Sequence, residues 1–384
     1  MKRTALVLAL IAAAPAGAQL LPALPPQIGA LSERVLGTVD RVVDTAPETL
    51  AQVRLDRIAD LVRSSRGAVV RDDRGDAARA GEVVLTDPGE AVLAALQRDG
   101  FRLIERTEVE GLGVGYARLA VPVGVRLDRA LARARRIAPE VAADVIHFES
   151  GDAAAPAGAA PVTSAAAGPV VGMIDGGVAD PDVRQQGFAA GAPRASDHGS
   201  AVAWLIGRGA PGARVVAADV YGRDPAGGGA VAIARAIGWL AKGGVGTVSI
   251  SLVGPPNPLL ARVVAAAQRR GMTIVAAVGN DGPAAPPAYP ASYPGVIAVT
   301  GVDARGRVLI EAGRAAHLDY AAPAAGFRAP NARGRMRVVR GTSFAAPLVA
   351  ARLAAIGRAR VDVEAVKGRG YGRGLVCGAC VTRR

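Results

Sequence analysis

Aromatic residues, lysine, histidine and cysteine are all scarce in this 384-residue sequence. Phe, Trp and Tyr make up only 3% of the chain, whereas hydrophobic residues make up 51%, so any core must be packed from Ala, Val, Leu and Ile. That hydrophobic content suffices for one sizeable core and a smaller domain. With three histidines in the whole chain, few side chains can act as a general base near neutral pH.

No stretch of the sequence is long and apolar enough for a membrane helix, which takes roughly 20 residues. The apolar run from Ala5 to Ala14 is shorter, follows Lys2 and Arg3, and precedes Ala16-Gly17-Ala18. This is the three-part pattern of a secretory signal peptide. We expect residues 1–18 to be removed and the protein to be exported, either to the periplasm or out of the cell, without a membrane span.

Cys377 and Cys380 are the only cysteines, in the sequence Cys-Gly-Ala-Cys. In an exported protein this spacing favours a small-loop disulfide; unpaired thiols and a redox or metal function remain alternatives. A zinc site takes about four ligands, and no histidine or second cysteine pair lies nearby. The sequence also has no Asp-rich loop of calcium-binding spacing. We therefore expect no metal and no cofactor.

The net charge of +13 comes almost entirely from arginine. The last 52 residues contain 12 Arg and Lys against Asp362 and Glu364, a net charge of +10. Such an excess could favour an anionic envelope surface or acidic substrates. A solvated basic tail, or the arginine bias of a GC-rich genome, explains it equally. We expect no nucleic-acid partner.

Residues 19–80 read as an N-terminal helical segment followed by a linker. Apolar residues recur at helical spacing from Leu31 to about Arg66, and Pro47 marks the first turn of a second helix. Residues 65–80 are rich in Arg, Asp, Gly and Ala and are predicted to be the linker. The role of the helices stays open, with packing on a neighbouring domain the simplest account.

Residues 81–150 alternate in the order βαββαβ, which is typical of a small α+β ferredoxin-like domain. Residues 151–168 are almost wholly Ala, Gly, Pro, Ser and Thr, a composition that predicts a flexible, protease-sensitive linker. Residues 361–384 are predicted to form a basic C-terminal tail that carries the cysteine pair.

Residues 169–360 alternate between near-continuous apolar strands and helices, which predicts an α/β fold with a parallel sheet covered on both faces. The expected strands are Val170–Ile174, Val215–Val220, Val245–Leu252, Thr273–Val278, Val296–Val302 and a short Arg337–Val339. The expected helices are Gly199–Ile206, Val231–Leu240, Pro258–Gln268 and an Ala-rich segment that Ser343 begins. Sites in such sheets form at the carboxyl ends of the strands.

Three polar residues stand where that rule places a site. Asp175 ends a strand, while His198 and Ser343 each begin a helix. Their chemistry fits nucleophilic catalysis: Ser343 attacks a carbonyl, His198 takes its proton, and Asp175 orients the imidazole. His147 lies in the other domain and His317 lacks a glycine-rich context. Taken alone, Ser343 is equally well explained as a helix N-cap.

A tetrahedral intermediate also needs hydrogen-bond donors for its oxyanion. The backbone N–H of Ser343 can supply one, and the side-chain amide of Asn280, directly after an apolar strand, can supply the other. A turn asparagine is the alternative for Asn280.

With Asp175, His198, Asn280 and Ser343 in this order, the chain resembles the subtilisin-like serine peptidases (S8 family). The local matches are Ile174-Asp175-Gly176-Gly177, His198 to Ala203, Ala277 to Asn280 and Gly341 to Pro347. The resemblance implies a serine endopeptidase acting on protein or peptide substrates. It also implies that Ser251-Leu252-Val253-Gly254 form the strand on which an extended peptide binds.

The resemblance further implies that residues 81–150 are a prodomain that assists folding and inhibits the site. We expect the zymogen to cut itself between about Phe148 and Gly168. Two positions depart from the family pattern: Ala201 replaces a second histidine, and Gly176 replaces a hydroxyl residue after the aspartate. They leave room for another interpretation, a weak or inactive peptide-binding protein. Esterase activity on the same residues is a third.

Overall fold

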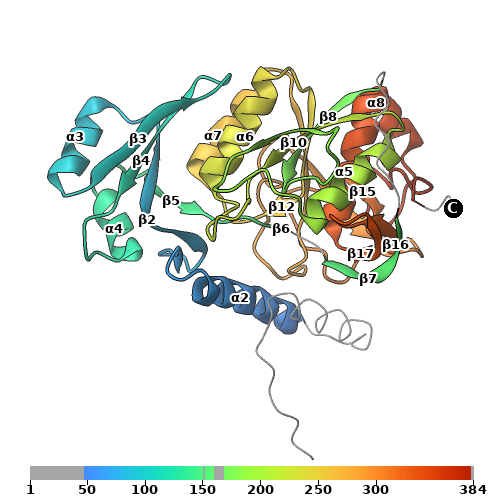
Figure 1. The fold of residues 1–384 in the computed structure, drawn as a ribbon, viewed down its shortest axis with the longest axis horizontal. Coiled ribbons are helices and arrows are strands. Elements are labelled where there is room, and N and C mark those ends of the chain that lie inside the picture. Colours follow the sequence, from blue (N-terminus) through green and yellow to red (C-terminus); the bar gives the residue numbers. More distant parts are fainter. Residues whose placement is uncertain (1–46, 150–151, 160–167, 382–384) are drawn as a thin grey trace, which may run out of the picture. The chain divides into compact units, whose positions relative to one another are not determined.

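A computed structural model of the chain describes residues 47–149, 152–159 and 168–381 (Figure 1). The predicted signal peptide, residues 1–18, lies outside the described residues. Residues 42–384 belong to one compact unit. Over the described ranges, no helix is both long and apolar enough to cross a membrane.

The larger part of the described chain is built on a seven-stranded sheet in the order β15-β14-β13-β11-β8-β10-β9, with all pairs parallel. Its strands are β8 (Val170–Asp175), β9 (Arg184–Gly187), β10 (Arg214–Asp219), β11 (Thr247–Ile250), β13 (Thr273–Ala277), β14 (Ile297–Val302) and β15 (Tyr320–Pro323). Every residue of β11, β14 and β15 is buried. The predicted α/β parallel sheet is confirmed; β9 and β15 were not predicted.

Helices cover both faces of this sheet (Figure 1). Helices α5 (Asp197–Gly209) and α8 (Ala346–Glu364) pack on one face. Helices α6 (Ala230–Lys242) and α7 (Pro258–Arg269) pack on the other. Side-chain caps start two of them: the Ser196 hydroxyl accepts from Gly199 N at 2.8 Å, and the Asn257 amide oxygen accepts from Leu260 N at 3.2 Å.

The N-terminal region is an antiparallel α+β layer in βαββαβ order, as predicted. Its elements are β2 (Ala77–Thr86), α3 (Glu90–Arg98), β3 (Arg102–Val109), β4 (Val114–Ala120), α4 (Leu127–Ala134) and β5 (Ala142–Val145). The strand order β5-β2-β4-β3 is that of a ferredoxin-like sheet. Helices α3 and α4 cover one face, and the other packs on α6 and α7 through residues such as Val84, Val114 and Tyr116.

The predicted linker at residues 65–80 is wrong. Strand β1 (Val69–Arg71) and the first residues of β2 pair there, with Val69 opposite Arg79. Val69 and Ala78 are fully buried. This edge of the sheet consists mainly of alanines and the Val69-Val70 pair, so its sequence lacks the clear alternation of apolar and polar residues that predicts a strand.

The predicted linker at 151–168 also contains structure. Strand β7 (Asp152–Ala159) pairs with β17 (Arg335–Arg340), which pairs in turn with β16 (Ala325–Pro330). Because a strand can form by backbone pairing, the Ala- and Gly-rich composition of this segment does not exclude it.

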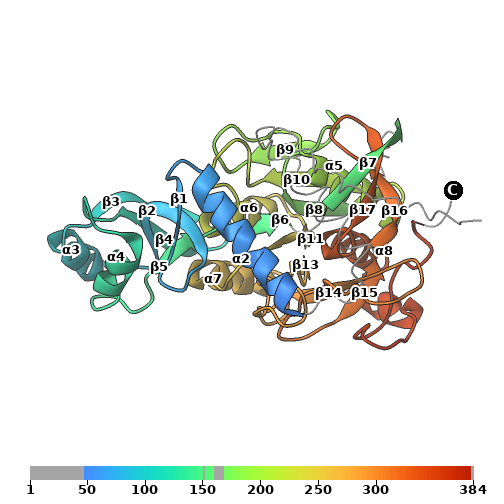
Figure 2. The same cartoon turned by 90° about the horizontal axis from the view of Figure 1, so that it is seen from below.

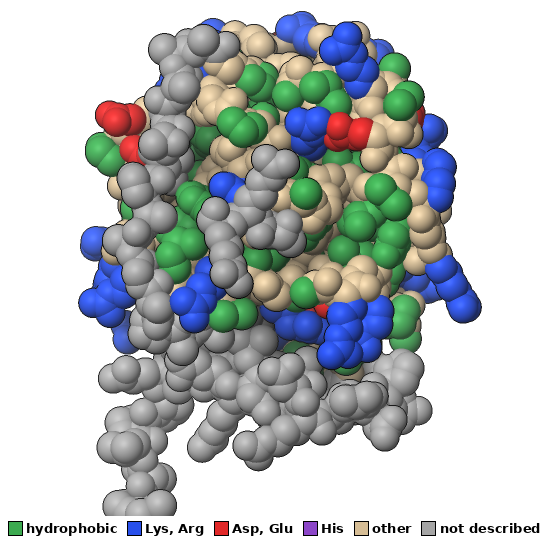
Figure 3. Space-filling model, turned by 90° about the vertical axis from the view of Figure 1, so that its right-hand side faces the viewer, with side chains coloured by type: hydrophobic (Ala, Val, Ile, Leu, Met, Phe, Trp, Pro, Cys, Tyr) green, Lys and Arg blue, Asp and Glu red, His purple; other side chains and the backbone are tan. Residues whose placement is uncertain are grey.

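The C-terminal tail is not simply a solvated extension. Helix α8 continues to Glu364, and Val376 is fully buried against the main core. Val376 N donates to Ala321 O at 2.8 Å, which ties the tail to β15. Figure 3 shows Lys and Arg side chains around this face, and Arg340, Arg352, Arg358 and Arg373 are in ion pairs.

The predicted helix around Pro47 is present as α2 (Pro47–Ser64). It runs beside the N-terminal sheet and onward over the main sheet (Figure 2). Ile58 is buried with Val69 and Ala77 on one side. On the other, Arg57 pairs with Asp281 at 2.8 Å. The helix thus contacts both parts of the described chain.

Candidate active site

Three of the residues singled out in the sequence follow neighbouring strands of the parallel sheet. Asp175 ends β8, Ser251 follows β11, and Asn280 comes soon after β13. Since β13, β11 and β8 are adjacent, their carboxyl ends meet at one edge of the sheet. The strand predicted at Val245–Leu252 ends at Ile250, so the chain turns out of the sheet at Ser251.

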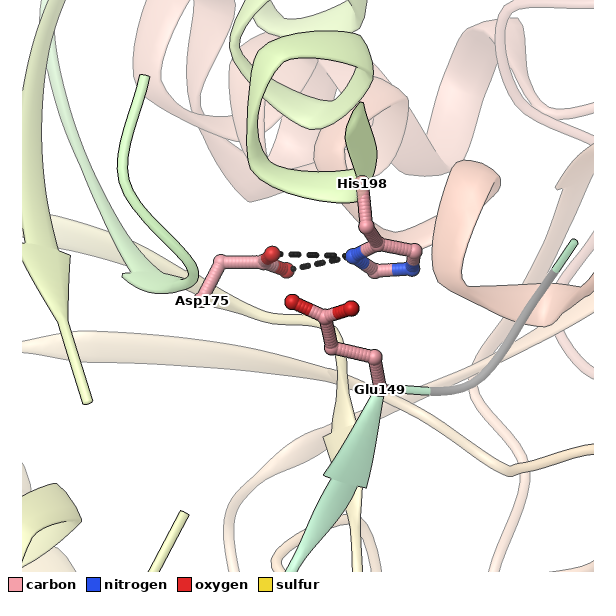
Figure 4. Close-up of side chains that lie close together, drawn as sticks. All are labelled: Glu149, Asp175 and His198. Carbon is pink, nitrogen blue, oxygen red and sulfur yellow. Dashed lines mark hydrogen bonds and ion pairs between the residues drawn. The ribbon is translucent and has the colours of Figure 1, made fainter. Parts of the chain in front are cut away.

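Asp175 and His198 form a buried pair (Figure 4). The two carboxylate oxygens lie 2.8 and 3.0 Å from His198 Nδ1, and Asp175 is fully buried. Gly176 N donates to the same carboxylate at 2.8 Å. This geometry holds the imidazole with Nδ1 on the aspartate, so that Nε2 is the nitrogen left for proton transfer.

Ser343 lies in a 3₁₀ turn, Thr342–Phe344, directly before α8. Gly341 enters the turn at φ +137°, a conformation that favours glycine. The Ser343 hydroxyl donates to Ser251 O at 3.1 Å, and the Ser251 hydroxyl donates to Ser343 O at 2.9 Å. The rings of His198 and Phe344 lie 5.3 Å apart, which brings the turn next to the histidine.

Asn280 is held against the same turn. Its side-chain oxygen accepts a hydrogen bond from Thr342 N at 2.9 Å, and the Thr342 hydroxyl donates to Gly279 O at 3.1 Å. Because the oxygen faces Thr342 N–H, the amide group is oriented with its NH₂ donors on the opposite side. The structure therefore gathers Asp175, His198, Asn280 and Ser343 at one place.

A fifth residue, Glu149, joins this group and was missed in the sequence. It belongs to β6 (Phe148–Glu149), which pairs antiparallel with β12 (Leu252–Val253), with Glu149 opposite Leu252. One carboxylate oxygen of Glu149, one of Asp175 and a ring nitrogen of His198 all lie within 4.8 Å of one another. The only sign of its role in the sequence is its position at the end of the small domain, residues 81–150.

Burial is the main cause that raises the pKa of Glu149 to about 7; His198 opposes the rise, and the carboxylates of Asp175, Asp219 and Asp197 add to it. Such a cluster could in principle ligate a cation. Since Asp175 is already hydrogen-bonded to Nδ1 of His198, the arrangement fits a proton-transfer site better.

The other positions noted in sequence lie as follows. His147 is fully buried, and burial lowers its pKa to about 4. His317 lies apart from the cluster, with Nε2 2.7 Å from Val296 O. Ala201 is buried in the main core. Cys377 and Cys380 form a disulfide.

Known proteins share both the sequence pattern and the fold of this chain. Residues 167–366 match the model of the subtilase family, Peptidase S8. The chain belongs to the subtilase family. Subtilisin BL of Lederbergia lenta is 32% identical to it over 198 residues, which cover 47% of this chain and 72% of that enzyme. Subtilisin E of Bacillus subtilis strain 168 is 30% identical over 209 residues, covering 48% and 54%.

Solved subtilases share the fold over more of the chain. Fervidolysin from Fervidobacterium pennivorans, a keratinolytic enzyme related to subtilisin, superposes with a TM-score of 0.64 at 18% identity, covering 84% of this chain and 64% of that one. The epidermin leader peptide processing protease of Staphylococcus aureus gives 0.55 at 14% identity, covering 78% and 97%. These likenesses show the fold. Membership of the subtilase family, supported by the sequence relatives, makes this protein a serine endopeptidase that acts on protein substrates.

Proposed function

We propose that this subtilase is made as an exported, self-processing zymogen, and that Asp175, His198 and Ser343 carry its catalysis. The observation that carries the proposal is the pairing of β6 with β12. An extended segment of the chain's own N-terminal region lies on the strand expected to bind substrate, with Glu149 beside the Asp175–His198 pair.

The proposed roles are those of a serine peptidase. Ser343 Oγ attacks the carbonyl carbon, and its proton passes to His198 Nε2 while Asp175 stabilises the imidazolium through Nδ1–H. The NH₂ group of Asn280 and the backbone N–H of Ser343 stabilise the oxyanion. The proton on His198 then goes to the leaving amine, and water hydrolyses the acyl-enzyme by the same steps in reverse.

Two flanking pairings support self-cleavage. Glu149 pairs with Leu252, the neighbour of the Ser251 whose carbonyl accepts from the Ser343 hydroxyl. Asp152 pairs with Arg340, three residues before Ser343. Both ends of this short stretch are therefore hydrogen-bonded close to the nucleophile. We propose that the bond cut within the predicted range of Phe148 to Gly168 lies between Glu149 and β7.

The proposed prodomain includes more than the βαββαβ layer. Helix α2 adds the Arg57–Asp281 ion pair, next to Asn280, and the Arg57 guanidinium lies 4.7 Å from the Phe148 ring centroid. A cavity there is shared by Arg54 and Arg57 of α2 and by Val253, Gly254 and Gly279 of the peptidase region. The cover thus extends over the substrate strand.

Expressing the full chain as wild type, Ser343→Ala and Ser64→Ala tests the proposal. Ser64 is an exposed serine of α2, so Ser64→Ala controls for the substitution itself. Wild type and Ser64→Ala should be cut between Glu149 and β7, found by mass spectrometry of the new termini, and Ser343→Ala should stay intact. Equal processing in all three would rule out self-cleavage.

The alternative of a peptide-binding protein is tested with a fluorophosphonate probe, which labels an activated serine. Labelling of processed wild type that disappears in Ser343→Ala and His198→Ala supports the peptidase. A processed form that never reacts would support the binder. Edman or mass analysis of exported material also tests removal of residues 1–18.

A further inference from the structure

Gly176 stands directly after Asp175, at the position where the family resemblance leads one to expect a hydroxyl residue. In sequence this looks like a lost hydrogen bond. In the structure the space is filled. A Cβ on Gly176 would lie 2.3 Å from Ser196 Oγ and 2.9 Å from Glu149 Oε1, both too close for a real contact. The missing side chain therefore leaves room both for Ser196, the N-cap of α5, and for the end of Glu149.

The pocket that receives this carboxyl group is strongly acidic. The charges of Asp175 in β8, Asp219 in β10 and Asp197 in α5 raise the pKa of Glu149, and His198 lowers it. Arg57 of α2 lies over the ring of the adjacent Phe148. On the remaining sides, Glu149 also interacts with Tyr221, whose hydroxyl donates to His147 O at 2.7 Å. An ionised carboxylate is unfavourable among three aspartates, whereas a neutral carboxyl or a carboxamide of the same shape is not.

We propose that Gly176 is a specificity-determining residue, whose missing side chain opens beside His198 a subsite for a substrate side chain ending in a neutral carboxyl or carboxamide, that of Glu or Gln. The inference rests on the proposed function in one respect, because it takes β6 as a stand-in for bound substrate. Gly176, which does not take part in the proposed chemistry, would then help to select what is cut.

The charges around the subsite make the binding of a Glu side chain depend on pH. The ordinary pKa of a glutamate is 4.5, and in the pocket it rises to about 7. Binding of a Glu side chain is then fully favoured below 4.5 and is lost as the pH rises through 7. A Gln side chain does not titrate, so its binding should not change with pH in this way.

The test uses full-chain enzyme that has processed itself, and peptides copied from residues 146–154 with Glu, Gln, Leu or Ala at position 149. At pH 5 the Glu and Gln peptides should exceed the Ala peptide in kcat/KM by about 10-fold, equivalent to about 1.4 kcal/mol. The ratio of Gln to Glu should grow by at least about 10-fold between pH 5 and pH 7.5.

Variants then assign the preference to Gly176. Ser196→Gly removes the two nearest clashing atoms, Oγ and Cβ of Ser196, and keeps an acceptable helix cap. Gly176→Ala in the Ser196→Gly background then adds a methyl group that still lies 2.9 Å from Glu149 Oε1. That double variant should lose the Gln-over-Ala ratio, and Ser196→Gly alone should keep it. Gly207→Ala, where an added Cβ meets nothing within 4 Å, is the control for glycine replacement.

Ratios within one enzyme cancel any general loss of catalysis. Equal kcat/KM for all four peptides in wild type, or a Gln-over-Ala ratio unchanged in the double variant, would overturn the inference while leaving the peptidase intact. Should the double variant fail to fold, the wild-type ratios and their pH dependence still decide. An enzyme that cuts none of the peptides and does not process itself would instead refute the proposed function.

Discussion

The interior of the peptidase region and the interface that joins it to the N-terminal region are built from different contacts. The strands β11, β14 and β15 are buried at every residue, whereas β3 of the N-terminal sheet exposes most of its residues. The contacts that join the two regions include many charges: Arg57 with Asp281, Arg79 with Asp224, Arg262 with Asp87, and Lys242 with Glu110. Partly exposed ion pairs add little free energy, so most of the stabilisation at this interface comes from its apolar part, where Val84, Val114 and Tyr116 pack on α6 and α7.

If the chain is processed as proposed, the peptidase region is the permanent core and the N-terminal region is a removable cover. Around the site, contacts within the peptidase region are short and buried, such as the Asp175–His198 pair. The cover contacts the site through Glu149, whose pKa is raised, and through Arg54 and Arg57, which pair with Asp281 at the rim. The following predictions probe this contrast, from the largest effect to the smallest.

Replacing the nucleophile should have the largest effect. Ser343→Ala should lower kcat for peptide hydrolysis by about 10⁶-fold, the magnitude known for subtilisin, to which this chain is similar. Melting temperature should change little, because the core keeps its packing. Steady-state kinetics and thermal unfolding measure both. If kcat decreased by less than about 10-fold, Ser343 would not be the nucleophile.

Next comes the oxyanion donor. Asn280→Ala should lower kcat by about 10²–10³-fold with little change in KM; the range is that known for the side-chain oxyanion donor of subtilisin itself. Asn331→Ala, whose side chain instead accepts from Arg333 N and Arg335 N, is the matched control. Unchanged turnover in Asn280→Ala would contradict the assignment.

Docking of the cover should depend on pH in two opposed ways. Glu149 titrates at 4.5 in water and at about 7 when docked, so its contribution is full below 4.5 and lost as the pH rises through 7. His147 titrates at 6.5 and at about 4, so its contribution is full above 6.5 and lost as the pH falls through 4.

Hydrogen exchange of Phe148 and Glu149 amides in full-chain Ser343→Ala measures this docking. Glu149→Gln should abolish the loss of protection on the alkaline side and retain the loss on the acid side. If Glu149→Gln left the whole profile unchanged, the titrating group on the alkaline side would have to be another residue.

The smallest effect concerns α2. Removing Arg57 should speed opening of α2 by up to about five-fold, since exposed pairs contribute at most about 1 kcal/mol, and the difference should shrink in high salt. Hydrogen exchange of α2 at low and high ionic strength detects it. Arg63→Ala breaks an exposed pair with Asp60 inside the helix and should leave opening unchanged.

Much of the fold was predictable because its elements carry apolar patterns. The catalytic candidates were predictable because polar residues follow buried strands and because His198 is one of only three histidines. Strands β7 and β9 were not, since Ala-, Gly- and Gln-rich segments become strands only through backbone pairing.

Glu149 and Gly176 show a different limit. Glu149 carries no signal in the sequence, and Gly176 is visible there only as a missing hydroxyl. Their relation arises because β6 docks on β12 and brings the Glu149 side chain next to Gly176. The same holds for α2, whose helical pattern was visible but whose partner Asp281 lies more than two hundred residues away.

Two of the contacts of the cover, β6 on β12 and α2 on Asp281, have a consequence for the timing of activation. Before cleavage the cover is tethered, and its effective concentration at the site is set by the chain. A single cut removes the tether and leaves both contacts in place, so occupancy then depends on the bulk concentration of the pair. Processing would not itself switch the enzyme on; dilution would, so the lag before activity should lengthen as the freshly processed protein is made more concentrated.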